Sequence, residues 1–159
     1  LRDDAMSHSL PTEIGMLTKM ISIDFTQNSL TGTIPTQLGL LTELTGPVST
    51  GDYADYGGLS FGTNQMMNTV PTQLGRLTKL STLMSFSTNK LTGPLPTELG
   101  NLQIKSGVLF YYNGLSQTIP TQLGRLTLLS QRIALDRRAR ARITVDVPAR
   151  GFTWAVIRR

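Results

Sequence analysis

Residues 71–78 read PTQLGRLT, and the same eight letters return at 120–127. Close variants, PTEIGMLT, PTQLGLLT and PTELGNL, begin at residues 11, 35 and 96. If each proline is position 1 of a unit, the units start at Pro11, Pro35, Pro71, Pro96 and Pro120. Self-similarity at a fixed period of about 20–50 residues is typical of repeat architectures. The stretch therefore predicts a stack of similar coils.

The spacing of the prolines gives the length of one coil. Successive prolines lie 24, 36, 25 and 24 residues apart. The long interval contains a 12-residue insert, PVSTGDYADYGG at 47–58, and without it the second unit also has 24 residues. Residues 1–10 fit the second half of a unit, so we expect an array that lacks its N-terminal cap. The expected solenoid covers 1–130, with a partial unit at 1–10.

Apolar residues recur at positions 4, 7, 10, 13, 15, 20 and 24, which predicts one buried stripe shared between neighbouring coils. In the first unit these positions hold Ile14, Leu17, Met20, Ile23, Phe25, Leu30 and Ile34. The alternation at positions 13 and 15 is typical of a strand with one face buried. Strands from successive coils would pair in parallel, about 4.8 Å apart.

Two polar or flexible positions have structural explanations. Position 18 is asparagine in four units: Asn28, Asn64, Asn89 and Asn113. Stacked in a ladder, its amide can pair with backbone groups that a non-helical turn leaves without partners. Position 22 is Gly32 or Gly93 in two units, which indicates a positive φ angle, and Asn68 takes that place in the second.

The 24-residue pattern resembles the plant-type leucine-rich repeat, whose units run roughly LxxLxLxxNxLTGxIPxxLGxLTx. The resemblance rests on residues 17–39, 86–102 and 110–126, and it ends near residue 130. It implies an α/β-type repeat: a curved solenoid with a parallel concave β-sheet and short 3-10 or irregular convex connectors. It also implies that partners bind to the outward strand positions 12, 14, 16 and 17 and to the flanks.

Only the fourth unit carries large side chains at these outward positions, namely Leu109, Tyr111 and Tyr112. Exposed tyrosine combines apolar area with a hydrogen-bonding tip, which favours partner contact. The alternative is that one ring merely covers the end of the array. Smaller polar candidates on the other rungs are Asp24, Thr26, Ser85 and Ser87.

The insert before the second strand carries Tyr53 and Tyr56 between glycines. Inserts in repeat proteins map to loops and often contact partners. A tolerated loop without a function stays the alternative. Two nearby acids do not supply the ligand number that calcium requires, so we expect no metal site.

Charge separates residues 131–159 from the rest. Residues 1–130 hold seven basic and eight acidic residues, whereas 131–159 hold eight arginines and two aspartates. We expect this tail to be a β-hairpin cap, a basic tail binding an anionic surface through Arg137, Arg138, Arg140 and Arg142, or the product of a misread gene.

Several functions have little support in the sequence. Cysteine is absent, His8 is the only histidine, and no phosphate-binding glycine motif occurs, so we expect neither catalysis nor a cofactor. Threonine recurs at positions 2 and 23, and an ice-binding function is the alternative that this pattern leaves open. The sequence favours a non-catalytic protein-binding or scaffold module, either an accessory subunit of a larger complex or a receptor-like recognition fragment.

Overall fold

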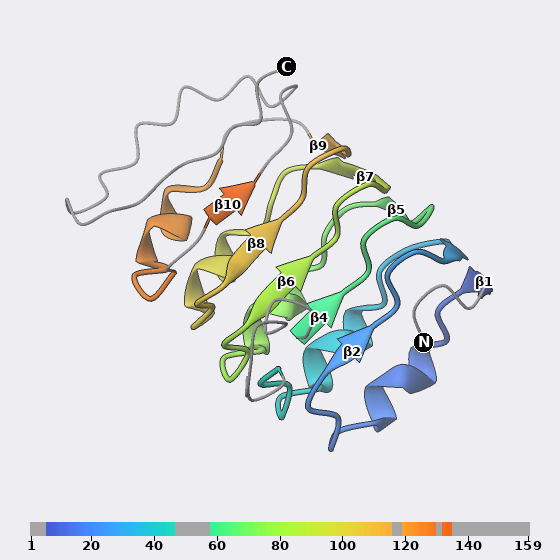
Figure 1. Cartoon of the computed structure of the whole chain (residues 1–159), viewed down its shortest axis with the longest axis horizontal. Coiled ribbons are helices and arrows are strands. Elements are labelled where there is room, and N and C mark those ends of the chain that lie inside the picture. The colour runs from blue at the N-terminus through green and yellow to red at the C-terminus, as the bar shows by residue number, and fades with distance from the viewer. Residues whose placement is uncertain (1–5, 47–57, 116–118, 130–131, 135–159) are drawn as a thin grey trace.

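The computed structural model describes residues 6–46, 58–115, 119–129 and 132–134. These residues form a curved stack of coils, each a flattened loop of chain lying on the next (Figure 1). Coils one to five begin at Pro11, Pro35, Pro71, Pro96 and Pro120. No α-helix occurs in the described parts of the chain. The fold is a leucine-rich-repeat solenoid, as expected from the sequence.

A short 3-10 helix follows each proline on the convex side. The helices are η1 (Thr12–Met16), η2 (Thr36–Leu40), η3 (Thr72–Arg76), η4 (Thr97–Asn101) and η5 (Thr121–Arg125). Proline suits the entry position because its φ is fixed and the first turn needs no N–H from it. Its carbonyl accepts from the N–H three residues later, at 3.2 Å for Pro11 and Ile14. This confirms the predicted 3-10 connectors.

The concave side is a five-stranded parallel sheet in the order β10-β8-β6-β4-β2 (Figure 1). Its strands are β2 (Ile23–Asp24), β4 (Gly58–Ser60), β6 (Leu83–Ser85), β8 (Gly107–Leu109) and β10 (Arg132–Ala134). The position-13 residues are register partners along the whole sheet: Ile23, Leu59, Met84, Val108 and Ile133. Because β10 pairs with β8, the sheet runs past residue 130, where the sequence pattern had suggested an end.

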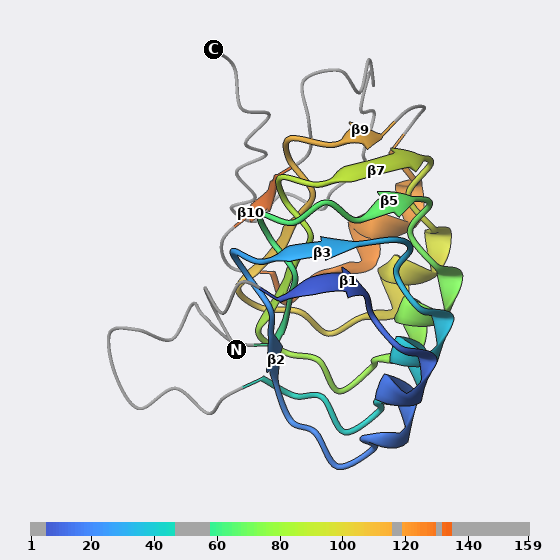
Figure 2. The ribbon, with the colours of Figure 1, turned by 90° about the vertical axis from the view of Figure 1, so that its right-hand side faces the viewer.

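A second set of parallel strands, which the sequence did not predict, lies on the flank (Figure 2). Strand β1 (Ser7–Ser9) pairs with β3 (Ser29–Thr31), and β7 (Lys90–Gly93) pairs with β5 (Met67–Asn68) and β9 (Gly114–Leu115). An isolated bridge from Thr33 to Met67 links the two groups. The predicted positive φ at position 22 is confirmed for Gly32, Asn68 and Gly93, and His8 shares it.

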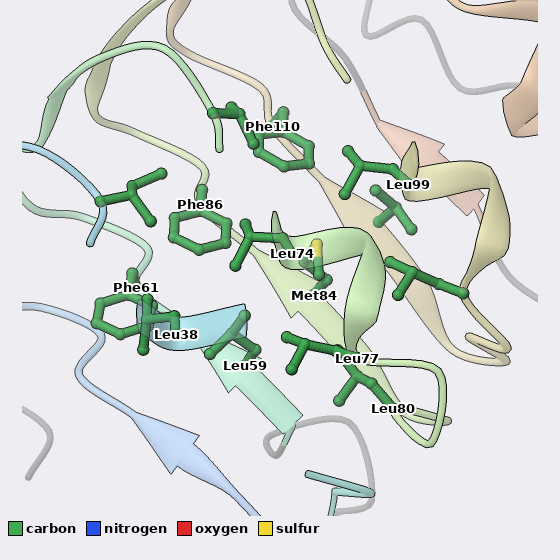
Figure 3. Close-up of a cluster of buried hydrophobic side chains, with 14 of the residues drawn as sticks. Leu38, Leu59, Phe61, Leu74, Leu77, Leu80, Met84, Phe86, Leu99 and Phe110 are labelled. Carbon is green, nitrogen blue, oxygen red and sulfur yellow. The ribbon is translucent and has the colours of Figure 1, made fainter. Parts of the chain in front are cut away.

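The apolar stripe forms a single core between the concave sheet, the flank strands and the 3-10 helices. A file of phenylalanines at position 15 runs through it, and Phe61, Phe86 and Phe110 are completely buried (Figure 3). The rings of Phe86 and Phe61 stack with centroids 5.3 Å apart, and those of Phe86 and Phe110 are 5.6 Å apart. Two residues assigned to the stripe are exposed instead: Leu17 is 52% and Met20 is 37% exposed. In coils two and three the same positions hold Leu41, Leu44, Leu77 and Leu80, which are completely buried because a preceding coil covers them.

Coil stacking depends on a glycine at position 5 of each coil, and this gives the first prediction. A Cβ on Gly100 would overlap the backbone oxygen of Gln122 in the next coil and lie 2.7 Å from its carbonyl carbon. Because backbone cannot move aside as a side chain can, Gly100→Ala should lower the free energy of unfolding by about 1–3 kcal/mol or more. Urea unfolding followed by circular dichroism measures this loss.

Gly114 offers a matched control. A Cβ there would lie 3.3 Å from the Leu91 oxygen and 3.5 Å from a Thr92 methyl carbon, and its φ is not in the left-handed region. Gly114→Ala should therefore cost much less than Gly100→Ala. Equal losses for the two variants would contradict the close approach at position 5.

Candidate functional site

The concave strands are held in place by the four asparagines of position 18. Each side-chain oxygen accepts from the backbone N–H at position 20 of the preceding coil: Met6, Leu30, Met66 and Leu91 are the donors, at 2.9–3.0 Å. For Asn64, the amide nitrogen donates to the carbonyls of Phe25 at 2.9 Å and of Phe61 at 3.1 Å. Asn89 and Asn113 make the equivalent bonds. These bonds join each coil to the one before it just where the chain leaves the concave strand.

The residue before each ladder asparagine has a positive φ, which the sequence analysis missed. Gln27, Thr63, Thr88 and Tyr112 have φ values of 54–58°. Such a conformation is uncommon for a side chain with a Cβ, above all for threonine. The N–H of Thr88 donates to the Tyr111 oxygen at 2.8 Å, so inter-coil bonding holds the backbone in this state. A glycine at this position would have signalled the turn, and none is present.

Leu109, Tyr111 and Tyr112 lie side by side in coil four at the concave face. Leu109 and Tyr111 are half-buried, and Tyr112 is 51% exposed. The two tyrosine rings contact each other edge to face, with centroids 5.3 Å apart. Tyr112 has the positive φ of its turn position, as the equivalent residues of the other coils do. These three residues form an apolar and aromatic surface with two phenolic hydroxyls, which we name the aromatic rung.

The remaining candidates of the concave strands differ in exposure. Asp24 and Thr26 are half-buried, and an Asp24 carboxylate oxygen accepts from the Thr26 N–H at 2.9 Å. Ser85 and Ser87, expected to face a partner, are buried, with only 7% and 6% exposed. Their hydroxyls lie 3.2 Å apart and bond to each other. These short, buried side chains offer a partner little contact area. We therefore remove Ser85 and Ser87 from the candidate surface.

Ser60 continues this buried serine group on the neighbouring strand, as the register partner of Ser85. It is 3% exposed, and its hydroxyl has no hydrogen-bond partner among the described residues. Tyr53, Tyr56, Arg137, Arg138, Arg140 and Arg142 lie outside the described residues. The candidate surface of the described chain is thus the aromatic rung together with Asp24 and Thr26.

Charge is sparse at this surface. Asp24 is the one charged residue at the outward positions of coils one to four. An ion pair lies on the connectors of coils two and three, where Lys79 Nζ is 2.7 Å from a Glu43 carboxylate oxygen. The hydrogen bond from Lys79 and its positive charge lower the pKa of Glu43, with a further contribution from Lys19. From β2 to β8 the concave face therefore offers a partner apolar and hydrogen-bonding contacts rather than a charged patch.

The histidine and acidic residues of the described chain are His8, Glu13, Asp24, Glu43 and Glu98. No cluster of three histidine or acidic residues suited to a metal ion occurs among them. His8 lies on β1 in the flank, where its Nδ1 is 2.9 Å from the Ser7 hydroxyl. None of the helices in the described part is long and apolar enough to span a bilayer.

Five exposed apolar side chains at the N-terminal end were not anticipated either. They lie on η1, on η2 and in the connector before β2: Met16, Leu17, Met20, Ile21 and Leu40. Position 6 is exposed in every coil and is polar in coils three to five, so the apolar Met16 and Leu40 are a feature of the first two coils. Comparison of that position between units could have revealed this surface from the sequence.

No protein-family model and no curated protein matches the chain. Solved structures do. In a crystal structure of PEPR1–AtPEP1, the match is 27% identical, covers 86% of this chain and 17% of that chain, and has a TM-score of 0.67. A second match is the leucine-rich-repeat ectodomain of the membrane receptor kinase GASSHO1/SCHENGEN3 from Arabidopsis thaliana, in complex with Casparian strip integrity factor 2. It is 29% identical over 80% of this chain and 14% of that chain, with a TM-score of 0.62.

A plant ice-binding protein has the same fold. The match has a TM-score of 0.70 and 24% identity, and it covers 86% of this chain and 40% of that chain. At that identity the likeness concerns the fold alone. The chain spans less than half the length of each of these three matched chains.

Proposed function

We propose, from the premise that this chain is a plant-type leucine-rich-repeat segment, that it is a non-catalytic module that binds a protein or peptide partner through its concave face and flanks. Among its solved neighbours, the GASSHO1/SCHENGEN3 ectodomain is in complex with Casparian strip integrity factor 2, and BIR3 with SERK2. Both a receptor-like recognition fragment and an accessory subunit of a larger complex fit this role.

The aromatic rung is the observation that carries the proposal. Tyrosine is enriched among the interface residues that contribute most to binding energy. A tyrosine buries apolar surface at modest entropic cost and keeps a hydrogen-bonding hydroxyl. Here the edge-to-face contact limits the freedom of both rings before a partner arrives. Asp24 and Thr26 extend the surface to coil one, three strands away, or about 14 Å at the spacing of paired strands.

Removing both rings tests the proposal. The double variant Tyr111→Ala and Tyr112→Ala should weaken partner binding by about 1–4 kcal/mol. The chain is used as bait in affinity capture with mass spectrometry, and the captured partner is then titrated against each variant by calorimetry. The double Tyr→Phe variant keeps the rings and should retain most of the affinity. Unchanged affinity of the alanine variant would exclude the aromatic rung as a contact.

Met67 provides a matched control on the other sheet. It is 42% exposed on β5, in the flank, so its loss removes exposed apolar area away from the concave face. Met67→Ala should leave affinity unchanged if the partner occupies the concave face alone. A loss with Met67→Ala and none with the tyrosine variants would move the binding surface to the flank.

Ice binding is the second candidate, because the threonines of position 2 form an exposed row along the η helices. They are Thr12, Thr36, Thr72, Thr97 and Thr121. Each hydroxyl lies 3.2–3.4 Å from the side-chain oxygen of the next residue and donates to it. The row at position 23 holds the exposed Thr33 and Thr69 but is interrupted by Pro94. Hydroxyls that bond within the chain and a broken row favour protein binding instead.

Thermal hysteresis separates the two candidates. A protein-binding module should give no gap between the melting and freezing points and should not shape ice crystals. A measurable gap that is lost on replacing Thr72 and Thr97 with bulky lysine would instead support ice binding.

A further inference from the structure

Coil four differs from the coils before it in the residue that follows its ladder asparagine. The first three ladder asparagines are followed by Ser29, Gln65 and Lys90, whereas Asn113 is followed by Gly114. No other Asn-Gly step occurs in the 159 residues. Glycine has no Cβ to shield its backbone nitrogen or to restrict backbone rotation. The backbone nitrogen of a glycine therefore reaches the side chain of a preceding asparagine more readily than that of a residue with a Cβ.

We propose that Asn113–Gly114 is a deamidation site that the folded solenoid protects and that opening of coil four exposes. The backbone nitrogen of Gly114 attacks Cγ of Asn113 and forms a new C–N bond. The Cγ–Nδ2 bond breaks, the proton of the attacking nitrogen passes to the leaving group, and ammonia departs from a succinimide ring. Water then opens the ring and leaves either aspartate or isoaspartate at residue 113.

The ladder hydrogen bonds explain the protection in the folded state. Asn113 is only 7% exposed. Its Nδ2 donates to the carbonyls of Phe86 at 2.9 Å and Phe110 at 3.0 Å, and its Oδ1 accepts from the Leu91 N–H at 3.0 Å. The side-chain amide is therefore fixed toward coil three and cannot turn toward Gly114 until these bonds break. Deamidation should follow the population of the locally opened coil.

The reaction product cannot restore the ladder. A carboxylate is an acceptor only, so the donor bonds to the two phenylalanine carbonyls are lost and a negative charge faces their oxygens. Isoaspartate in addition lengthens the backbone by one carbon at the turn. Tyr111 precedes this turn and its carbonyl also accepts from Asn113, at 3.4 Å. Modification should thus disorder the aromatic rung. The effect of this on partner binding rests on the proposed function, whereas the deamidation measurement is independent of that function.

The test compares folded and unfolded forms of the whole chain at mildly alkaline pH. Deamidation of residue 113 is followed by peptide mass spectrometry in buffer and in denaturing urea, with a synthetic peptide of residues 110–115 as the unfolded reference. We expect the peptide and the unfolded chain to react at similar rates. The folded chain should react at least about tenfold more slowly, which corresponds to an opening free energy of ~1.4 kcal/mol. A folded chain as fast as the peptide would overturn the proposal.

Two variants complete the experiment. Gly114→Ala keeps the fold by the geometry given above, and it should remove the fast reaction in urea; persistence of that reaction would overturn the assignment to this step. Asn113→Asp carries the reaction product and should melt at a lower temperature than the unmodified chain. An unchanged melting temperature would show that the modified coil restores its ladder, contrary to the proposal.

Discussion

Replacement of Phe86 by alanine is expected to lower the free energy of unfolding by about 3–5 kcal/mol, the usual range for removal of a fully buried aromatic ring. Phe86 is 0% exposed at the centre of the phenylalanine file (Figure 3). Its ring stacks on Phe61 and Phe110 with interplanar angles of 9° and 11°. The variant loses apolar burial, leaves a cavity between coils two and four, and breaks both ring contacts.

Phe25 is the matched control, because it has the same residue type at the same position of the first coil. It is only partly buried, and its ring is tilted by 34° against Phe61. Phe25→Ala should therefore cost clearly less than Phe86→Ala. The exposed Lys79, changed to glutamine, serves as the reference for a surface change. Urea unfolding curves give the free energy of unfolding of each variant. Similar losses of this free energy for Phe25→Ala and Phe86→Ala would contradict tighter packing at the centre of the phenylalanine file than at its end.

Stacking of coils explains why the fold could be predicted from the sequence. Each position of the repeat unit has one structural role, which recurs at a fixed interval. The proline at position 1 therefore has the same role in every coil, and so does the apolar residue at position 13. Ile23 and Leu59 are register partners although the insert separates them in the sequence. The flank strands escaped prediction because they have only two to four residues and show no alternation long enough to recognise.

Burial of individual residues was harder to predict, because it depends on the neighbouring coils and not only on the sequence of one repeat unit. Leu17 has the same position as the completely buried Leu41 and Leu77, yet it is half exposed. Ser85 points outward by its position, yet it is buried because it is short and bonds to Ser87. Sequence position therefore indicates which face a side chain occupies, and side-chain size together with the adjacent coils decides how much of it a partner can touch.

The second large effect is expected for Asn64→Ala, in the middle of the ladder. The Leu30 N–H has Asn64 Oδ1 as its acceptor, at 2.9 Å, and would be left unpaired in a buried place at a cost of about 1–3 kcal/mol. The carbonyl of Phe61 would keep one side-chain donor, because Asn89 also donates to it at 2.9 Å. The carbonyl of Phe25 would likewise keep a bond from Asn28. Loss of the remaining donor bonds should add about 0.5–1.5 kcal/mol.

The sum, about 1.5–4.5 kcal/mol, comes from lost hydrogen bonds, whereas the loss at Phe86 comes from lost apolar packing. Asn64→Asp separates the two parts of the argument, because aspartate still accepts from Leu30 but cannot donate to the carbonyls and places a negative charge beside them. Amide hydrogen exchange reports the Leu30 N–H directly. Its protection should fall sharply in Asn64→Ala and persist in Asn64→Asp at temperatures where both are folded. Equal protection in the two variants would mean that the ladder oxygen does not hold coil one against coil two.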